Sequence, residues 1–493
     1  VRPWQVLAIT FTNKAAGELK SRIAQALGEE IGSDVMACTF HSLCVRILRR
    51  YIDALGFEKS FTIYDTDDSV RVAKECLKEL NLSDKLFPPK QLLSMIGRAK
   101  DELLEPGEYE LRAGGDYKKQ VAAKVYHKYQ QKLKASNALD FDDLIAMTVK
   151  LFTEHPDILE FYQRRYRYVM VDEYQDTNHA QYRLVSLLSQ SHRNLCVVGD
   201  DDQSIYKFRG ATIENILSFE DQFDDVVTIR LEQNYRSTQK ILDAANSIIK
   251  HNTARKGKEL WTGNGEGQSI CVYTADDESD EAAFVAATIE QNVAQGEKYG
   301  GHAILYRMNA QSRSLESYFV KAGIPYRIIG AIRFFERKEI KDVVAYLSVI
   351  NNPSDSLRLR RIINEPKRGI GAATVESVYQ MSQVLGQTML EVMQSADQYA
   401  SLSRKREGLM QFGRVLQGLI DMADEGASLS ELFDAMLEET GYLRALEAEG
   451  DEGQARIENI DEFKSTILQY ESDNEEPTLF GFLEEISLYT DLD

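Results

Sequence analysis

The chain has 493 residues, of which 43% are hydrophobic and 28% are charged. This composition excludes a disordered or fibrous chain, and the length allows about three or four domains. No apolar run approaches the ~18 residues that a membrane helix requires, so we expect no membrane partner. The five cysteines are scattered without a CxxC pair, which favours reduced core thiols over a zinc site: Cys38, Cys44, Cys76, Cys196 and Cys271.

The acidic charge is concentrated at one end of the chain. The net charge is −20, and the segment from Asp421 to Asp493 holds 22 acidic residues against three basic ones, a net charge of −19. Residues 1–420 are therefore almost neutral and can carry local basic patches, so the overall charge does not exclude a nucleic-acid ligand. The acidic segment either repels DNA from one face or binds a basic partner.

Two apolar stretches near the start of the chain predict strands. Residues 5–12 predict a buried strand with a helix following from Asn13, and residues 35–42 predict a second strand followed by a basic helix. His41 ends the second strand, where it is either a capping or core histidine or a ligand contact. Three arginines at helical spacing form either a solvated face or a phosphate-binding face: Arg46, Arg49 and Arg50.

Residues from about 52 to 140 lose the strand pattern. Asp65 begins an N-cap cluster, and Tyr117 to Leu133 form an amphipathic stretch rich in lysine. These features predict a helical insertion in an α/β domain. Leu139 to Leu144 then begin the helix that leads back to the sheet.

The stretch from Tyr168 to Thr177 is the centre of the chain's organisation. The apolar run Tyr-Val-Met-Val ends in two adjacent carboxylates, Asp172 and Glu173. A buried parallel strand delivers charge in this way to the carboxyl edge of its sheet, where α/β proteins bind ligands. Most Asp-Glu pairs are solvated surface, but the strand before this pair favours a functional role in metal binding and in activating water.

A second strand with its own polar cluster follows at residues 194–210. The strand ends at Gly199, and the loop holds Gln203, which can hydrogen bond to a phosphate oxygen or to water. Aromatic residues then alternate with cations, as in a platform that stacks the bases of single-stranded nucleic acid: Tyr206, Lys207, Phe208 and Arg209. A short stretch of this kind, taken alone, packs in a core more often than it binds a ligand. Its place directly after the strand and Gln203 favours binding.

Residues 226–238 begin a second α/β unit, and further strands are predicted at 269–274, 302–306 and 326–329. This alternation predicts a second, mostly parallel sheet within about 110 residues. Arg236 is either an arginine finger or one half of a structural Arg–carboxylate pair.

From residue 336 onward the pattern is nearly all helical. Residues 366–374 interrupt it with Lys367, Arg368 and Gly-Ile-Gly. The backbone amides of such a turn at a helix start suit a phosphate of duplex DNA, and a plain helix–helix turn fits equally well.

Six motifs, in this order and spacing, resemble those of the UvrD/PcrA/Rep family of superfamily 1A DNA helicases, and the match covers essentially the whole chain. The motifs are Ala-Ile-Thr-Phe-Thr-Asn-Lys-Ala-Ala (8–16), Thr-Phe-His-Ser (39–42), Val-Asp-Glu-Tyr-Gln-Asp-Thr (171–177), Gly-Asp-Asp-Asp-Gln-Ser-Ile-Tyr (199–206), Leu-Glu-Gln-Asn-Tyr-Arg-Ser (231–237) and Leu-Tyr-Arg-Met-Asn-Ala-Gln-Ser-Arg (305–313). Each is moderately specific alone, and together they are very specific.

The resemblance implies an α/β fold with two RecA-like parallel-sheet domains, 1A and 2A, each carrying a mostly helical insertion, 1B or 2B. The expected boundaries are 1–48 and 146–213 for 1A, 49–145 for 1B, 214–335 for 2A and 336–493 for 2B. It also implies an ATP-dependent 3′→5′ helicase and single-strand translocase of DNA repair or replication, with ATP and Mg²⁺ between 1A and 2A. Implied partners are single-stranded DNA, single-strand/duplex junctions and repair or replication loading proteins, with a monomer or weak dimer in the bacterial cytosol and nucleoid.

Site roles follow from the same resemblance, residue by residue. Asp172 would hold Mg²⁺, and Glu173 would be the catalytic base. Gln203 would couple the γ-phosphate to the DNA site, Tyr235 would stack on adenine, and Arg236 would stabilise charge on the transferring phosphoryl group. Residues expected along the single strand are Phe11, Thr12, Asn13, His41, Tyr206, Phe208, Arg209, Arg307 and Asn309, and those expected at the duplex are Lys367, Arg368, Gly369 and Gly371.

The chain departs from the family pattern in three respects. Phe208 stands where the family usually has Trp, and Met308 replaces a small or polar residue. The phosphate-binding Gly-x-Gly-Lys-Thr loop and motifs V and VI are missing, because the family places them before Val1 and after Asp493. We therefore expect a chain that is cut at both ends and inactive by itself.

Two other functions remain open. A scaffold that binds single-stranded DNA without hydrolysing ATP would need no phosphate loop, although the carboxylate pair, Gln203 and Arg236 argue against it. A helicase–nuclease subunit would require a nuclease domain after Asp493.

Overall fold

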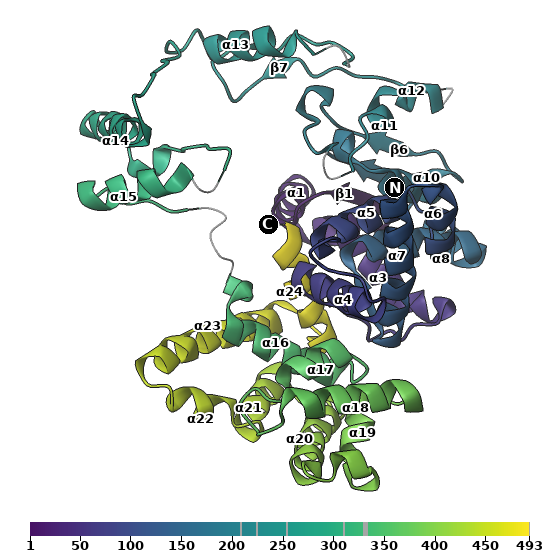
Figure 1. Cartoon of the computed structure of the whole chain (residues 1–493). Coiled ribbons are helices and arrows are strands. Elements are labelled where there is room, and N and C mark those ends of the chain that lie inside the picture. Colours follow the sequence, from purple (N-terminus) through teal and green to yellow (C-terminus); the bar gives the residue numbers. More distant parts are fainter. Residues whose placement is uncertain (208–209, 223–224, 253–254, 309–310, 329–333, 493) are drawn as a thin grey trace. The chain divides into compact units, whose positions relative to one another are not determined.

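The computed structural model describes residues 1–207, 210–222, 225–252, 255–308, 311–328 and 334–492 (Figure 1). The chain divides into two compact units, Val1–Asp224 with Arg333–Asp493, and Asp225–Ile332. Both units contain helices and strands, and every strand pair among the described residues is parallel. In the described part of the chain, no helix has the length and apolar character needed to cross a membrane.

A four-stranded parallel sheet organises the first unit. Its order is β2-β1-β5-β6, with bounds β1 (Val6–Thr10), β2 (Met36–Thr39), β5 (Tyr168–Val171) and β6 (Leu195–Val197). Alternation along the strands turns Ile9, Val169 and Val171 to one face, where they pack against α3 (Phe40–Tyr51), α8 (Phe141–Glu154) and α10 (His179–Ser189). Because all three strand pairs are parallel, the carboxyl ends of the four strands lie at one edge of the sheet.

The helices around this sheet begin at side-chain caps. Thr12 accepts a hydrogen bond from the Ala15 amide at the start of α1 (Asn13–Leu27), and Thr39 accepts one from the Ser42 amide at the start of α3. Asn178 caps α10 in the same way. The remaining helices of this part are α2 (Glu29–Ser33), α9 (Pro156–Arg165), α11 (Glu214–Leu217) and α12 (Phe219–Gln222).

The segment predicted as a helical insertion is mostly helical and also contains a small sheet. Strands β3 (Thr62–Tyr64) and β4 (Ala138–Asp140) pair in parallel. Its helices are α4 (Thr66–Glu79), α5 (Pro89–Asp101), α6 (Pro106–Ala113) and α7 (Tyr117–Ala135).

Residues 334–492 are helical, as predicted. The helices are α16 (Lys338–Asn351), α17 (Ser356–Ile362), α18 (Ala372–Leu385), α19 (Met389–Gln394), α20 (Arg406–Asp424), α21 (Leu429–Glu439), α22 (Tyr442–Glu447), α23 (Asp451–Asp473) and α24 (Leu479–Leu492). A buried polar seam joins them to β3 and α4. The Tyr64 hydroxyl donates to Asp355 Oδ1 at 2.7 Å, and Arg358 pairs with Asp68 at 3.2 Å.

The described residues of the second unit do not form the predicted parallel sheet. Among them, two residues on each of β7 (Gln233–Asn234) and β8 (Trp261–Thr262) pair, and the helices are α13 (Gln239–Ile249), α14 (Glu278–Ala294) and α15 (Ser312–Ala322). The described residues of the segments predicted as strands at 269–274, 302–306 and 326–329 are in no strand ladder. A strand requires a hydrogen-bonded neighbour, and alternating apolar residues do not supply one.

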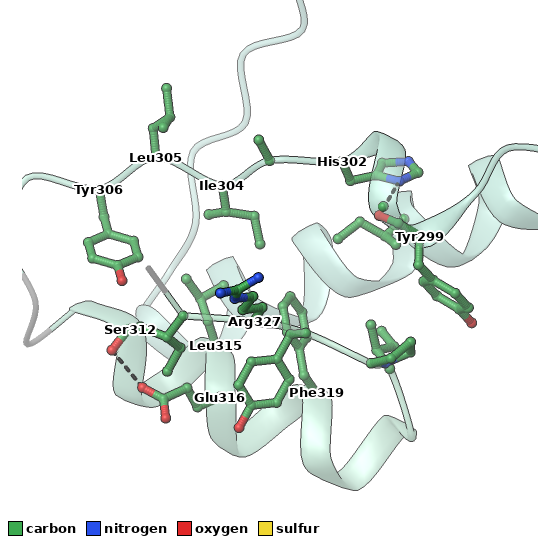
Figure 2. Close-up of a pocket in the computed structure, with 17 residues that line it drawn as sticks. Tyr299, His302, Ile304, Leu305, Tyr306, Ser312, Leu315, Glu316, Phe319 and Arg327 are labelled. Carbon is green, nitrogen blue, oxygen red and sulfur yellow. Dashed lines mark hydrogen bonds between the residues drawn. The ribbon is translucent and has the colours of Figure 1, made fainter. Parts of the chain in front are cut away.

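A cavity of about 890 Å³ lies between α14, α15 and these extended segments (Figure 2). Ile304 and Tyr306 point toward α15, whereas Leu305 points away and is 95% exposed (Figure 2). The alternation typical of a strand is therefore present in this segment although the ladder is not.

Candidate functional site

The carboxyl edge of the four-stranded sheet brings together most of the site residues predicted in the first unit. Phe11 follows β1, His41 lies just after β2, Asp172 and Glu173 follow β5, and Gln203 lies in the loop after β6. The first and last of these residues, Phe11 and Gln203, are 192 positions apart in sequence. Parallel strand pairing places all of them along one edge.

The two carboxylates lie on a backbone that neighbouring strands hold at both sides. The Asp172 amide donates to the carbonyl of Ile9 in β1 at 2.9 Å, and the Tyr174 amide donates to the carbonyl of Val198 at 3.0 Å. Glu173 has a φ of +51°, a left-handed conformation that turns the chain sharply at the strand end. Both carboxylates are consequently exposed at the edge.

The donor set at this edge suits a hard divalent cation. Asp172 Oδ1 accepts from the Glu173 amide at 2.9 Å, and the exposed carboxylate can still offer oxygen to Mg²⁺. In the described part of the chain, Thr10 Oγ1 at the end of β1 is buried and lacks a hydrogen-bond partner. An ordered water molecule or an ion commonly satisfies a buried polar atom of this kind.

Gln203 is exposed in a short turn after β6. Its Nε2 donates to Asp200 Oδ2 at 2.7 Å, so the side chain is held by its own loop. Tyr206 follows in the same loop and is 40% exposed. Lys207 of the predicted stacking platform is exposed as well, and Phe208 and Arg209 lie outside the described residues.

The residues after β1 and β2 have internal contacts as well. Phe11 packs edge-on against Phe40 with ring centroids 5.4 Å apart, and Asn13 Nδ2 donates to the carbonyl of Leu488 at 3.1 Å. The hydroxyl of Thr12 is the helix cap described above, which is a structural role that the sequence comparison did not assign. Contacts within the protein therefore hold each of these side chains in place, and their contact with DNA stays a prediction.

His41 is half-buried and packs against Phe141, with ring centroids 5.2 Å apart. Burial of the ring lowers the pKa of His41 from 6.5 to about 4. The imidazole is therefore neutral at pH 7, and it can contact a nucleic acid as a polar ring but not as a cation.

The second unit holds Tyr235, Arg236 and Arg307, and all three side chains are exposed. Asn234 Oδ1 accepts from the Arg236 amide at 2.9 Å, which fixes the turn that presents Tyr235 and Arg236. The Arg307 amide donates to Gln311 Oε1 at 3.1 Å. Asn309 lies outside the described residues.

In the Lys-Arg-Gly-Ile-Gly turn, the Arg368 side chain has partners within the protein. Arg368, which we expected at the duplex, donates from its guanidinium to protein acceptors, including the Ile362 carbonyl at 2.9 Å and the Thr440 carbonyl at 3.1 Å, and it stacks over Phe412. The guanidinium thus joins the turn to the Thr440 carbonyl and to the ring of Phe412. Sequence spacing does not distinguish such an inward-facing arginine from a phosphate-binding one.

The rest of that turn is exposed. Lys367, Gly369 and Gly371 all lie at the surface, and Gly369 has a φ of +68°, which favours glycine. Gly371 is the N-cap residue of α18, a helix start of the kind at which main-chain amides bind anions.

Sequence reasoning missed one residue at the sheet edge. Gln175 is 1% exposed and hydrogen bonds to Glu173 and to the Asp200 amide. It belongs to the Tyr-Gln-Asp-Thr stretch after the carboxylates, but a glutamine there carries no periodic or charge signal that would distinguish it.

Comparison with known proteins identifies the family. Residues 1–224 match the UvrD/REP helicase N-terminal domain, and residues 229–493 match the UvrD-like helicase C-terminal domain. The chain is 48% identical over 494 residues to the ATP-dependent DNA helicase PcrA of Bacillus subtilis (strain 168), covering 100% of this chain and 67% of that protein. PcrA proteins of Staphylococcus epidermidis (strain ATCC 12228) and Staphylococcus aureus (strain Mu50) are each 47% identical over 496 residues, covering 100% of this chain and 68% of theirs. The chain spans about two thirds of the length of these relatives. The chain belongs to the UvrD/PcrA/Rep family of superfamily 1 helicases.

Proposed function

We propose that this protein is an ATP-dependent DNA helicase that translocates 3′→5′ along single-stranded DNA and separates strands at a single-strand/duplex junction. The observation that carries the proposal is the shared sheet edge of Asp172, Glu173 and Gln203, with Tyr206 in the loop of Gln203. The residues proposed for hydrolysis and the residue proposed to stack a base then follow two neighbouring strands of one sheet. The relatives named PcrA, at 47–48% identity along the whole chain, support the same activity.

ATP and Mg²⁺ are the cofactors in this proposal. Mg²⁺ bound with ATP supplies charge neutralisation on the phosphates. Asp172 would hold the metal, and Glu173 would orient the attacking water and take its proton. Tyr235 would stack on the adenine, and Arg236 would stabilise charge on the transferring phosphoryl group.

The DNA-binding roles follow the same division. Phe11, Asn13, His41 and Tyr206 would contact the single strand from the first unit, and Arg307 would contact it from the second. Lys367, with Gly369 and Gly371, would bind a phosphate of the duplex through an ammonium group and backbone amides. Thr12, Phe208, Arg209 and Asn309 belong to the same predicted set.

The finer architecture belongs to the proposal as well. Residues 1–48 and 146–213 would form one RecA-like domain and 214–335 a second, with 49–145 and 336–493 as their insertions. The protein would work in the bacterial cytosol and nucleoid, as a monomer or weak dimer, with repair or replication proteins that load it.

The test is ATP turnover by the full-length protein with and without single-stranded DNA. We expect Glu173→Gln to abolish DNA-stimulated turnover and to leave DNA binding intact, because the amide keeps the shape of the side chain but cannot take a proton. Glu160→Gln is the matched control, since Glu160 is an exposed acid of α9 that pairs with Arg164. Turnover by Glu173→Gln at the wild-type rate would contradict the role of the base, and DNA binding by a wild type without turnover would indicate a scaffold.

A further inference from the structure

Gln175 lies between the carboxylate pair and the loop that carries Gln203. Its side chain is 1% exposed. Its Nε2 donates to Glu173 Oε2 at 2.7 Å, and its Oε1 accepts from the Asp200 amide at 2.9 Å. The same Nε2 also lies 3.5 Å from Asp176 Oδ2 as a longer hydrogen bond. The buried side chain of Gln175 thus connects these carboxylates to the neighbouring loop.

The two bonds fix the orientation of the amide. A carboxamide has a donor end and an acceptor end, and a main-chain N–H can only donate. The Asp200 amide therefore holds the oxygen of Gln175 toward the loop and leaves the NH₂ group toward Glu173. The reverse orientation would place an oxygen against a carboxylate and a donor against a donor, so it is disfavoured at both ends.

The loop approaches this amide closely. A Cβ on Gly199 would lie 2.6 Å from Gln175 Oε1 and 2.7 Å from Ile216 Cδ1, closer than side-chain carbons approach other atoms. The loop is held again where the Ser204 hydroxyl donates to the carbonyl of Gln175 at 3.3 Å. A shift of the loop therefore moves Gln175, since little free space separates them.

The hydrogen bonds continue along the loop. Asp200, whose amide holds Gln175, accepts from Gln203 Nε2 at 2.7 Å through its carboxylate. A continuous series of bonds thus runs from Glu173 through Gln175 and Asp200 to Gln203, three residues before Tyr206.

We infer that Gln175 is a positioning residue that sets the Glu173 carboxylate and transmits movement of the 199–206 loop to it. The inference rests on the proposed function, because it assumes that Glu173 is the base and that DNA occupies the loop. When DNA moves the loop, the Asp200 amide moves the Gln175 side chain, and the donor at Nε2 moves the carboxylate.

The test compares Gln175→Met with Gln181→Met in the full-length protein. Methionine keeps the length of glutamine and removes both hydrogen bonds. Gln181 is the matched control, because it is also buried, at 6% exposed, and its Oε1 accepts from the Asn178 amide at 2.9 Å without contact to the carboxylate pair. Gln175→Glu is a second variant, which retains the acceptor for Asp200 but loses the donor to Glu173.

We expect both Gln175 variants to lower kcat for DNA-stimulated ATP hydrolysis by about 10- to 100-fold, the usual effect of a misplaced catalytic group. KM for ATP should stay within about threefold, since the variants leave the residues proposed to bind ATP intact. Affinity for single-stranded DNA should not change. The ratio of DNA-stimulated to basal turnover should fall, because movement of the loop no longer reaches the Glu173 carboxylate. A lost fold would instead lower DNA affinity and kcat together.

Two results would overturn the inference alone. One is a wild type with DNA-stimulated turnover whose two Gln175 variants keep kcat within threefold, and the other is an equal loss in Gln181→Met. A wild type without any DNA-stimulated turnover would refute the proposed function, and the inference with it.

Discussion

Lys100 offers the sharpest test of how the first unit is stabilised. Its Nζ lies 2.6 Å from Asp140 Oδ2 and 2.8 Å from Asp143 Oδ1, and the residue is 2% exposed on α5. The Tyr129 hydroxyl donates to the same Asp140 oxygen at 3.0 Å. We predict that Lys100→Met, which keeps the side-chain length, strongly destabilises this unit because two buried carboxylates lose their cation.

The magnitude follows from the two contacts. Each charge-assisted hydrogen bond contributes about 1.5–3 kcal/mol, and breaking a buried ion pair by removing one partner costs about 3–5 kcal/mol. These contributions overlap, so the expected loss in the free energy of unfolding is about 3–5 kcal/mol at pH 7. A variant that also replaces both aspartates by apolar residues should recover part of the loss.

The pH dependence has a definite sign. Burial lowers the pKa of Lys100, but Asp140 and Asp143 outweigh burial and raise it above its usual value. The contribution of Lys100 is therefore complete below its unfolded pKa and is lost only as pH rises through the folded pKa, far above neutrality. Burial raises the pKa of Asp140, but Lys100 outweighs this and lowers it in the wild type.

Burial already raises the pKa of Asp143 to about 6 in the wild type. In Lys100→Met the carboxylates have no cation, so the folded pKa of Asp140 rises above its unfolded value and that of Asp143 rises further. The native state of the variant then binds more protons than its unfolded state, and its stability rises as pH falls from 7 toward 5. The deficit relative to wild type should shrink over that range.

Urea unfolding followed by circular dichroism measures the effect. Arg22→Met is the control, since Arg22 forms an exposed i,i+4 pair with Glu18 and should cost less than about 0.5 kcal/mol. A loss below about 1 kcal/mol in Lys100→Met, or a deficit that does not shrink at pH 5, would refute the account of a buried ion cluster.

Three further predictions concern the site. Gly199→Ala places a Cβ 2.6 Å from Gln175 Oε1, so it should lower the free energy of unfolding by about 1–3 kcal/mol and lower DNA-stimulated turnover. Thermal or urea unfolding and a turnover assay measure the two, and wild-type values of both would exclude the close approach. Arg368→Met should cost about 2 kcal/mol by removing the guanidinium donor from the Thr440 carbonyl, whereas Lys367→Ala should leave stability unchanged and reduce the salt slope of duplex binding by about 1. Unfolding curves and binding titrations at several salt concentrations check both, and the reverse pattern would contradict the roles given to the two residues. Tyr206→Ala should weaken single-strand binding about 5- to 150-fold, because one base loses its stacking partner. A fluorescence titration measures the affinity, and an unchanged value would remove Tyr206 from the DNA site.

Much of the candidate site could be predicted from the sequence because it follows from strand direction. Apolar runs that end in polar residues identify His41, Asp172 and Gln203, and the family resemblance adds Phe11. Parallel pairing then brings those strand ends to one edge. The helical nature of residues 336 onward was also predictable, since 3.6-residue periodicity is a local property.

Other features depend on contacts distant in sequence and could not be predicted. The alternation at residues 302–306 is strand-like, yet pairing depends on a neighbour that local pattern does not specify. Arg368 carries the same charge whether it faces DNA or the Thr440 carbonyl, and only the fold shows the second. Gln175 is recognised only once β5 and the loop after β6 lie side by side.

The central claim is ATP-driven strand separation, and the most direct measurement is unwinding of tailed duplexes by the full-length protein with ATP and Mg²⁺. The account predicts that wild type separates a duplex with a 3′ single-stranded tail and not one with a 5′ tail. Glu173→Gln should bind the 3′-tailed duplex and separate neither substrate. Absence of ATP-dependent separation of either substrate by wild type, or equal separation by Glu173→Gln, would contradict the account.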